Sequence, residues 1–166
     1  MKEKIKHYLK EILLFALVMT IFANAISLYK SQDLNKQRLL LTSHKLINNT
    51  LYSPPRDKPI LLHIWATWCP VCKAEVDNIQ RLSNYYEVIT IAVNSGSDYD
   101  IHKYMKERNL NYKVINDTSS ELAQKLNIAD YPTTFIYDKN GNLVFSEVGY
   151  TSSFGLWIRM VYASFK

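Results

Sequence analysis

The chain has 166 residues, of which 48% are hydrophobic and 21% charged, and its net charge at pH 7 is +5. The length suits one domain of ordinary size with an additional segment, and the ordinary charge and 13% aromatic content exclude a disordered chain. The positive charge is small and forms no stripe of Lys and Arg, so we expect no nucleic-acid partner.

The N-terminus predicts a signal-anchor segment over residues 1–29. Residues 1–11 are basic, and 18 residues from Ile12 to Tyr29 carry no charge before Lys30. A run of that length reaches the lower bound for a membrane-spanning helix, and the preceding lysines predict a cytoplasmic N-terminus with the rest of the chain exported. We therefore expect a single-pass protein of the inner (cytoplasmic) membrane, with its domain on the periplasmic, extracytoplasmic side.

Two other interpretations of this segment remain open. The tripeptide Ala23-Asn24-Ala25 has the small-x-small form of a signal-peptidase site, so a signal peptide cleaved after Ala25 would also export the domain. The third interpretation is a buried helix in a soluble core.

Residues 30–57 are interpreted as a linker followed by an irregular segment. An edge strand is expected at 38–41 and one helical turn at 43–49, before a turn-rich stretch at 53–59 that contains three prolines. The globular domain is expected to occupy residues 58–166.

The pattern of residues 58–166 predicts alternating strands and helices. Nearly continuous apolar runs at 60–66 and 88–93 are typical of strands buried on both faces. The other expected elements are helices from Pro70 through Leu82 and at 98–108, a strand at 112–115, a short helix at 119–126, a hairpin of 133–137 with 143–148 around Asn140-Gly141, and a C-terminal helix. On the last helix we expect one core-facing apolar side formed by Phe154, Trp157, Ile158, Val161 and Phe165. This order of elements predicts an α/β protein with a three-layer α/β/α sandwich.

The only two cysteines form the motif Cys69-Pro70-Val71-Cys72, between a buried strand and a helix. The free N–H groups and the dipole of a helix N-terminus favour an anion, so we expect Cys69 to ionise more readily than a free thiol. Cys72, one turn into the helix, is expected to be less exposed. This asymmetry predicts an attacking thiolate, Cys69, and a resolving thiol, Cys72.

A metal site and a static disulfide are the alternatives for this motif. Structural zinc needs four ligands, and the chain offers no second Cys pair and only scattered histidines. A structural disulfide over so short a loop would stabilise little. We therefore expect no metal site, and no cofactor other than a redox-active Cys69–Cys72 disulfide.

The stretch from Ile64 to Glu75, IWATWCPVCKAE, resembles the active-site strand and helix of thioredoxin-fold proteins, and more narrowly of membrane-anchored TlpA-like disulfide oxidoreductases. Further stretches at 91–96, 114–117, 131–136 and 147–151 are most similar to the suppressor-of-copper-sensitivity D branch. The resemblance covers residues 58–164 and implies a thioredoxin fold.

The same resemblance implies that Pro132 is a cis proline facing Cys69, and that the residue before it offers backbone hydrogen bonds to a substrate strand. That residue is Tyr131, which is bulkier than the usual Val or Thr. This departure leaves the substrate preference of the family in question for this chain.

Three further residues are candidates for tuning the dithiol. His63, six residues before Cys69, is either an acceptor for the Cys72 proton or a core histidine with no catalytic part. Glu75, three residues after Cys72, either shares that proton transfer or is a solvated first-turn glutamate. Trp68 either shapes a docking surface or is purely structural.

The resemblance implies an extracytoplasmic thiol:disulfide oxidoreductase that reduces the disulfides of exported partner proteins. It also implies a transmembrane thiol-electron transporter as the source of electrons. A disulfide oxidant or isomerase is an alternative, because the direction depends on how strongly each redox state is stabilised. A copper(I)-binding dithiol module is a second alternative, because soft thiolates select that ion.

Overall fold

The computed structural model describes residues 2–166. In chain order the elements are α1 (Lys2–Lys30), a short 3₁₀ helix (Ser31–Asp33), β1 (His44–Lys45), β2 (Leu51–Tyr52), β3 (Ile60–Trp65), α2 (Pro70–Ser83), β4 (Glu87–Val93), α3 (Asp98–Glu107), β5 (Lys113–Asp117), α4 (Glu121–Lys125), β6 (Thr133–Tyr137), β7 (Leu143–Val148) and α5 (Ser153–Ser164). From β3 onwards the type and order of the elements are those that the sequence predicts.

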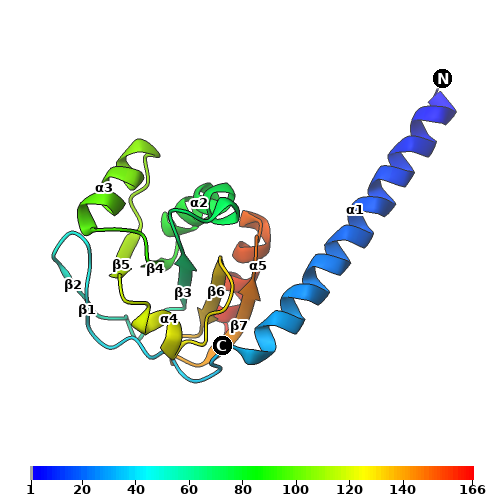
Figure 1. The fold of residues 1–166 in the computed structure, drawn as a ribbon. Helices are drawn as coiled ribbons and strands as arrows, with labels where there is room; N and C mark the ends of the chain where they lie inside the picture. The colour runs from blue at the N-terminus through cyan, green and yellow to red at the C-terminus, as the bar shows by residue number, and fades with distance from the viewer. Residues whose placement is uncertain (1) are drawn as a thin grey trace.

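The centre of the domain is a mixed five-stranded sheet in the order β5-β4-β3-β6-β7 (Figure 1). β3 is parallel to β4 and antiparallel to β6, so Ile64 lies opposite Ile91 on one side and Thr133 on the other. This central position explains the continuous apolar run of β3, whose six residues are all buried.

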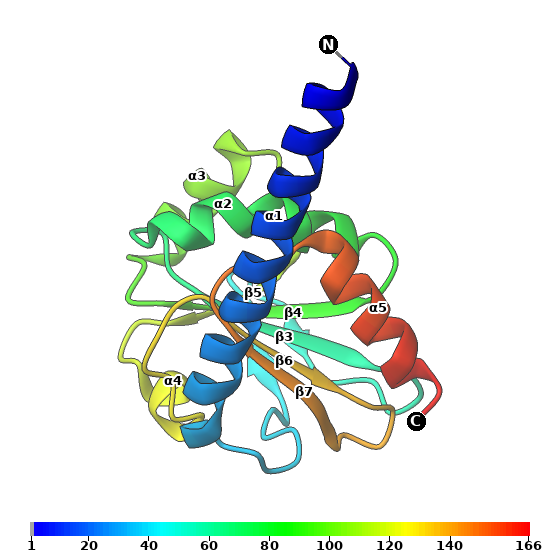
Figure 2. The same cartoon turned by 90° about the vertical axis from the view of Figure 1, so that its right-hand side faces the viewer.

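Helices and an irregular segment cover the two faces of the sheet (Figure 2). Apolar side chains of α2, α3 and α5 pack in one core cluster with Leu61 and Trp65 of β3. The opposite cluster joins Leu62 and Ile64 to the short helix α4. The predicted three-layer α/β/α arrangement is therefore confirmed.

The segment before β3 differs from its predicted local structure. Residues 38–41, all of which the structure describes, form no strand, and residues 43–49 contain β1 and a turn rather than a helical turn. Four apolar side chains of this segment nevertheless pack in the core cluster on the α4 side: Leu34, Leu41, Leu46 and Tyr52. Because α4 has five residues and covers little of that face, the irregular segment completes the core there.

The C-terminal helix packs through a different side from the one predicted. α5 buries Leu156, Met160 and Ala163, whereas Phe154 is 71% exposed. Other large apolar residues of α5 and of the position after it are also exposed: Trp157, Ile158, Tyr162 and Phe165. The prediction was wrong because the aromatic residues dominate the apolar pattern, while the close approach of α5 to α2 and the sheet suits smaller and more flexible side chains.

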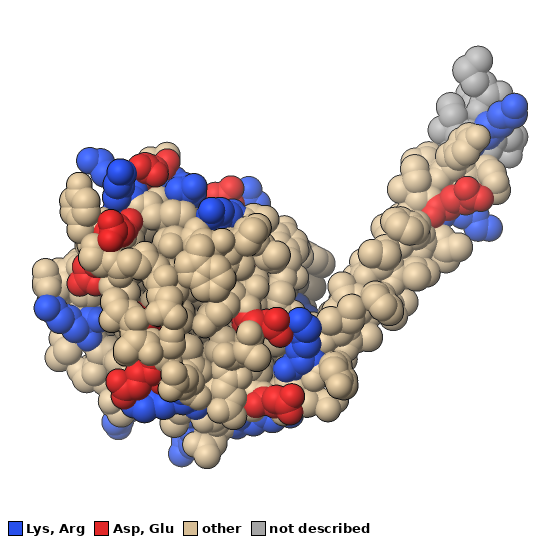
Figure 3. All heavy atoms as spheres, viewed as in Figure 1, with Lys and Arg blue, Asp and Glu red and all other residues tan. Residues whose placement is uncertain are grey.

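Helix α1 leaves the domain as a single long rod (Figure 1). The stretch Lys6–Asp33 is long and apolar enough to cross a membrane, and 6% of its most apolar window is buried against the rest of the protein. Figure 3 shows its middle without charged side chains, between charged residues near its N-terminus and others on the domain. The low burial excludes the third interpretation of this segment, a core helix of a soluble domain.

Candidate active site

The two cysteines lie where the central strand passes into the first helix of the domain. β3 ends at Trp65 and α2 begins at Pro70, with Cys69 as the N-cap residue. The Cys69 Sγ accepts a hydrogen bond from the backbone N–H of Cys72 at 3.2 Å. A proline at the first helical position fits this start, because its missing N–H would have no partner within the helix.

Both cysteines are free thiols, and both are largely covered. Cys69 is 5% exposed and Cys72 is 1% exposed. Burial raises the pKa of Cys72 well above its ordinary range, and contacts with Cys69 and the nearby charge of Glu75 act in the same direction. Cys72 is therefore a protonated thiol at neutral pH and needs a proton acceptor before it can attack a disulfide.

A loop before β6 lies against Cys69. The peptide bond between Tyr131 and Pro132 is cis, and the Cys69 thiol donates a long hydrogen bond to the carbonyl oxygen of Tyr131 at 3.6 Å. The structure thus brings together Cys69 and the two loop residues that the sequence analysis singled out, although they are more than 60 positions apart.

Trp68 forms part of the surface beside the dithiol. Its side chain is 54% exposed, and its indole Nε1–H donates to the carbonyl of Asn94 at 3.1 Å. The indole ring lies edge-on to the Tyr131 ring, with 5.5 Å between their centroids. An exposed ring held by both contacts is suited to form part of a docking surface for a protein substrate.

Glu75 is buried, so the interpretation as a solvated first-turn glutamate is wrong. Its carboxylate is fully enclosed, with Oε1 accepting the backbone N–H of Thr151 at 3.0 Å and Oε2 without a hydrogen-bond partner among the described residues. Burial raises the pKa of Glu75 to about 8, opposed by the Thr151 hydrogen bond and reinforced by the charge of Glu147. Because Glu75 follows Cys72 by three positions in α2, the two side chains share one face of the helix.

His63 is also buried, but its surroundings do not favour a charged imidazole. Its Nδ1 lies 2.9 Å from the hydroxyl oxygen of Thr134 on the neighbouring strand, and burial lowers the pKa of His63 to about 3. At neutral pH the ring is therefore uncharged, with a partner of its own in the core.

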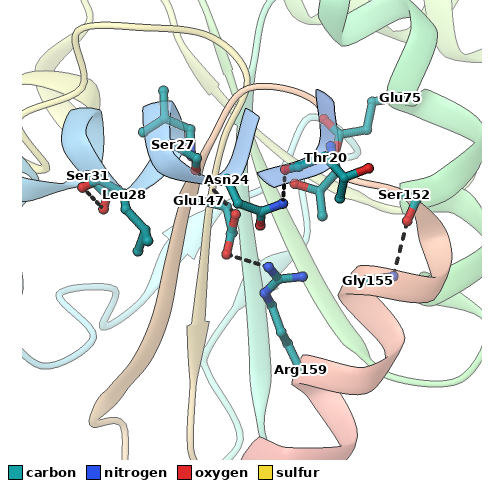
Figure 4. A network of polar contacts seen from close by, with 12 residues as sticks. Thr20, Asn24, Ser27, Leu28, Ser31, Glu75, Glu147, Ser152, Gly155 and Arg159 are labelled. Carbon is teal, nitrogen blue, oxygen red and sulfur yellow. Dashed lines mark hydrogen bonds and ion pairs between the residues drawn. The ribbon is translucent and has the colours of Figure 1, made fainter. Parts of the chain in front are cut away.

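The surroundings of Glu75 contain residues to which the sequence assigned no role at the dithiol, although two of them lie in the stretch 147–151 (Figure 4). Glu147 at the end of β7 forms an ion pair with Arg159 of α5 at 2.8 Å, and Thr151 supplies the backbone N–H that Glu75 accepts. No local spacing connects these residues with α2, because they are more than 70 positions away and only the packing of β7 and α5 brings them to it.

No group of three or more His, Cys, Asp or Glu side chains suited to hold a metal ion occurs within residues 2–166 as far as their side chains are described. His63, the histidine nearest to the motif in sequence, lies in the core beside Thr134.

Known proteins with a similar sequence place the chain in a family. A profile of the AhpC/TSA family matches residues 33–146. A thioredoxin-like protein of Haemophilus influenzae is 29% identical over 98% of both chains. The thiol-disulfide oxidoreductase ResA of Bacillus subtilis is 29% identical over 75% of this chain and 70% of its own.

Solved structures agree with the fold. StoA of Bacillus subtilis superposes with a TM-score of 0.63 at 22% identity, covering 70% of this chain and 93% of StoA. A thioredoxin-family thiol:disulfide interchange protein of Chlorobium tepidum superposes with a TM-score of 0.68 at 23% identity, covering 78% of this chain and 97% of that one. The chain thus has the thioredoxin fold that its motif predicts, and it belongs to the AhpC/TSA family.

Proposed function

We propose that this protein is an extracytoplasmic thiol:disulfide oxidoreductase that reduces the disulfides of partner proteins through Cys69 and Cys72. The observation that carries the proposal is the position of Cys69, whose Sγ caps α2 and lies 3.6 Å from the Tyr131 carbonyl beside a cis proline. The name of the relative ResA, a thiol-disulfide oxidoreductase, supports the same class of reaction.

The reaction begins with the Cys69 thiolate, which attacks one sulfur of a partner disulfide. A mixed disulfide forms between Cys69 and that sulfur, and the second partner sulfur leaves as a thiolate. Cys72 then loses its proton and attacks the Sγ of Cys69, which releases the first partner sulfur and leaves a Cys69–Cys72 disulfide. Two electrons have passed from the dithiol to the partner.

Glu75 is the acceptor that we propose for the Cys72 proton. It shares a helix face with Cys72, and the charge of its ionised form acts on that thiol. A carboxyl group with a pKa of about 8 is mostly protonated at pH 7, so the ionised fraction accepts the Cys72 proton, and its high proton affinity matches it to proton transfer near neutral pH. His63, which burial keeps uncharged, has no part in this step.

Helix α1 supports a location at the membrane, with the domain outside the cytoplasm. The basic residues before the apolar run favour this sidedness. We propose that the clients are exported proteins with thiols or disulfides and that a transmembrane thiol-electron transporter regenerates the dithiol. The motifs around Cys69 and Tyr131 favour the TlpA-like group and its suppressor-of-copper-sensitivity D branch.

The reduction potential of the Cys69–Cys72 pair decides the direction of the reaction. We expect a value toward the reducing end of the thioredoxin-like range, near about −270 mV, whereas a value near about −120 mV would indicate an oxidant. Equilibration of the protein with glutathione or dithiothreitol buffers, followed by thiol counting, measures it.

Substitution of each cysteine tests the assignment of roles. Cys72→Ser removes the resolving thiol, so mixed disulfides between Cys69 and partner proteins should accumulate and appear on non-reducing gels. Cys69→Ser removes the nucleophile and should reduce insulin reduction to the uncatalysed rate. Full reductase activity in the Cys69→Ser variant would refute the proposal.

A further inference from the structure

The C-terminal end of α1 continues onto the domain and contacts β7 and the loop before β6, next to the active site. Figure 4 shows Ser27 of this helix end turned toward Glu147 of β7. Although most of α1 is exposed, Ser27 near its end and Ser31 in the 3₁₀ helix that follows are buried. This end of the helix is therefore part of the packed structure as well as the exit of the anchor.

Ser27 forms two hydrogen bonds with the end of β7. Its hydroxyl donates to the Glu147 carboxylate at 3.2 Å and accepts the backbone N–H of Val148 at 2.9 Å. The second contact occupies an edge donor of β7, which is the last strand of the sheet. A single side chain of α1 thus replaces a missing neighbouring strand at this point.

Lys30 contacts the loop that precedes β6. Its Nζ lies 3.1 Å from the carboxylate of Asp130, which immediately precedes Tyr131 and the cis Pro132. The backbone carbonyl of Asp130 also accepts the hydroxyl of Thr133 at 2.7 Å, so Lys30 contacts a residue that is fixed to the start of β6.

The two contacts of α1 converge on one structural unit. Val148 is paired with Thr133 across the β6–β7 ladder, and the N–H of Gly149 donates to the carbonyl of Pro132 at 2.8 Å. Ser27 therefore holds the end of β7, and Lys30 holds the loop that leads into β6. Between them lies Pro132, and the neighbouring carbonyl of Tyr131 contacts Cys69.

We propose that Ser27 and Lys30 are positioning residues of the active site, which hold the 130–132 loop against Cys69 from the membrane helix. The expected effect on turnover rests on the proposed function, whereas the expected effect on the exposure of Cys69 does not.

Substitutions of Ser27 and Lys30 should differ in the size of their effects on the loop. Ser27 is buried and its hydrogen bonds are shielded from water, whereas the Lys30–Asp130 pair is about half exposed and such pairs are weakened by solvent and salt. We therefore expect the larger effect from Ser27→Ala, a smaller one from Lys30→Ala, and the largest from the double variant.

The test compares these variants in the full chain, purified in detergent or lipid nanodiscs and reduced. Because Cys69 is covered by the loop, loosening the loop should expose it, and alkylation of Cys69 by iodoacetamide at fixed pH should accelerate at least threefold in Ser27→Ala and in the double variant. With insulin as substrate, KM should rise at least threefold while kcat stays within twofold, because the loop positions substrate and not the thiols. Ser27→Thr, which keeps the hydroxyl, should restore both readouts.

Two matched controls remove similar groups without touching the loop. The hydroxyl of Thr20 bonds within α1, to the carbonyl of Ala16, so Thr20→Val should leave both readouts unchanged. The same is expected of Lys125→Ala, which breaks an exposed pair with Glu121.

The outcomes separate the two proposals. If the Ser27→Ala, Lys30→Ala double variant matches the parent in the alkylation of Cys69, the positioning role is refuted, whatever the insulin assay shows. If Cys69→Ser retains the turnover of the parent, the oxidoreductase proposal fails, and the alkylation rates still decide whether α1 positions the loop.

Discussion

Two buried titratable side chains give this small domain opposite sensitivities to acid and base. Glu75 has a pKa raised to about 8, and His63 has a pKa lowered to about 3. In both cases burial favours the uncharged form. The core under the dithiol is therefore most favourable near the pH at which both groups are neutral in the folded protein.

Replacing Glu75 should remove the dependence of stability on rising pH. The folded-state pKa lies above the ordinary value of 4.5, so the stability that the protonated group allows is complete below about pH 4.5 and is lost as the pH rises toward 8. The free energy of unfolding of Glu75→Gln, relative to the parent, should increase by about 1.4 kcal/mol per pH unit across that window. Urea unfolding of the reduced full chain in detergent at several pH values measures it.

His63→Asn is the matched comparison, because its effect belongs to the opposite window. The folded-state pKa of His63 lies below the ordinary value of 6.5, so stability is complete above about pH 6.5 and is lost as the pH falls toward 3. The asparagine variant should gain on the parent only below pH 6.5, with Thr134 keeping a polar neighbour. If Glu75→Gln shows no gain on the parent between pH 5 and 8, the carboxyl is not buried and neutral as described.

At the scale of elements, α5 shows how a helix can present its largest apolar side chains to the outside. The packed side is made by Leu156, Met160 and Ala163, while Phe154 and Trp157 point away from the sheet. Arg159 on the same helix pairs with Glu147 of β7. The orientation of α5 is therefore determined by its close contact with the sheet and by the ion pair of Arg159 near its middle, and not by its aromatic residues.

Truncation of one residue on each side of α5 tests this orientation. Leu156→Ala creates a cavity in the core and should lower the free energy of unfolding by about 2–5 kcal/mol. Phe154→Ala, on the exposed side, should change it by less than about 0.5 kcal/mol. Chemical unfolding followed by tryptophan fluorescence distinguishes them, and a larger loss in Phe154→Ala than in Leu156→Ala would mean that α5 is turned the other way.

At the scale of the whole molecule, the apolar helix α1 and the domain form a connected structure. α1 ends at Lys30, the 3₁₀ helix follows, and the Asn35 N–H donates to the carbonyl of Leu126 beyond α4. The irregular segment then runs across the face of the sheet, where Leu41 and Tyr52 complete the core. The chain leaves little free linker between α1 and the domain, so the position of the active site relative to α1 is restricted.

The helix is expected to remain attached as an uncleaved anchor. The parent chain and an Ala25→Tyr variant, whose bulky side chain blocks a small-x-small cleavage site, should both keep their full length in a bacterial host and differ in mass only by the substitution itself. Both should stay in the membrane pellet after carbonate extraction. A parent chain shorter than the Ala25→Tyr variant by the first 25 residues would show that cleavage occurs.

The positions of the two thiols could be predicted from the sequence because they depend only on neighbouring residues. Cys69, Pro70 and Cys72 lie within one helical turn, so the start of α2 alone places the nucleophile at the helix end and the second thiol beneath it. The central strands β3 and β4 were predicted equally well, since burial on both faces requires continuous apolar runs such as that of β3. Neither inference depends on which distant segment packs against the motif.

The packing of the segment before β3 could not be predicted, because it depends on distant parts of the chain. Leu34, Leu41 and Tyr52 are separated by polar and turn residues and show neither a helical nor a strand period. Each is buried only because the short helix α4 leaves part of the sheet uncovered. Isolated apolar residues in an irregular segment carry no periodic signal, so their place in the core could not be predicted from the sequence.

The sequence alone determined the fold class, the dithiol and the apolar N-terminal helix, because these depend on runs, spacings and charges within short stretches of chain. Only the tertiary structure decided that Glu75 is buried, that α5 turns its aromatic residues outward, and that Ser27 contacts the end of β7 while Lys30 contacts the loop before Pro132. Each of those facts depends on residues that are distant in the chain, and a carboxyl group acquires its proton affinity only from the neighbours with which folding surrounds it.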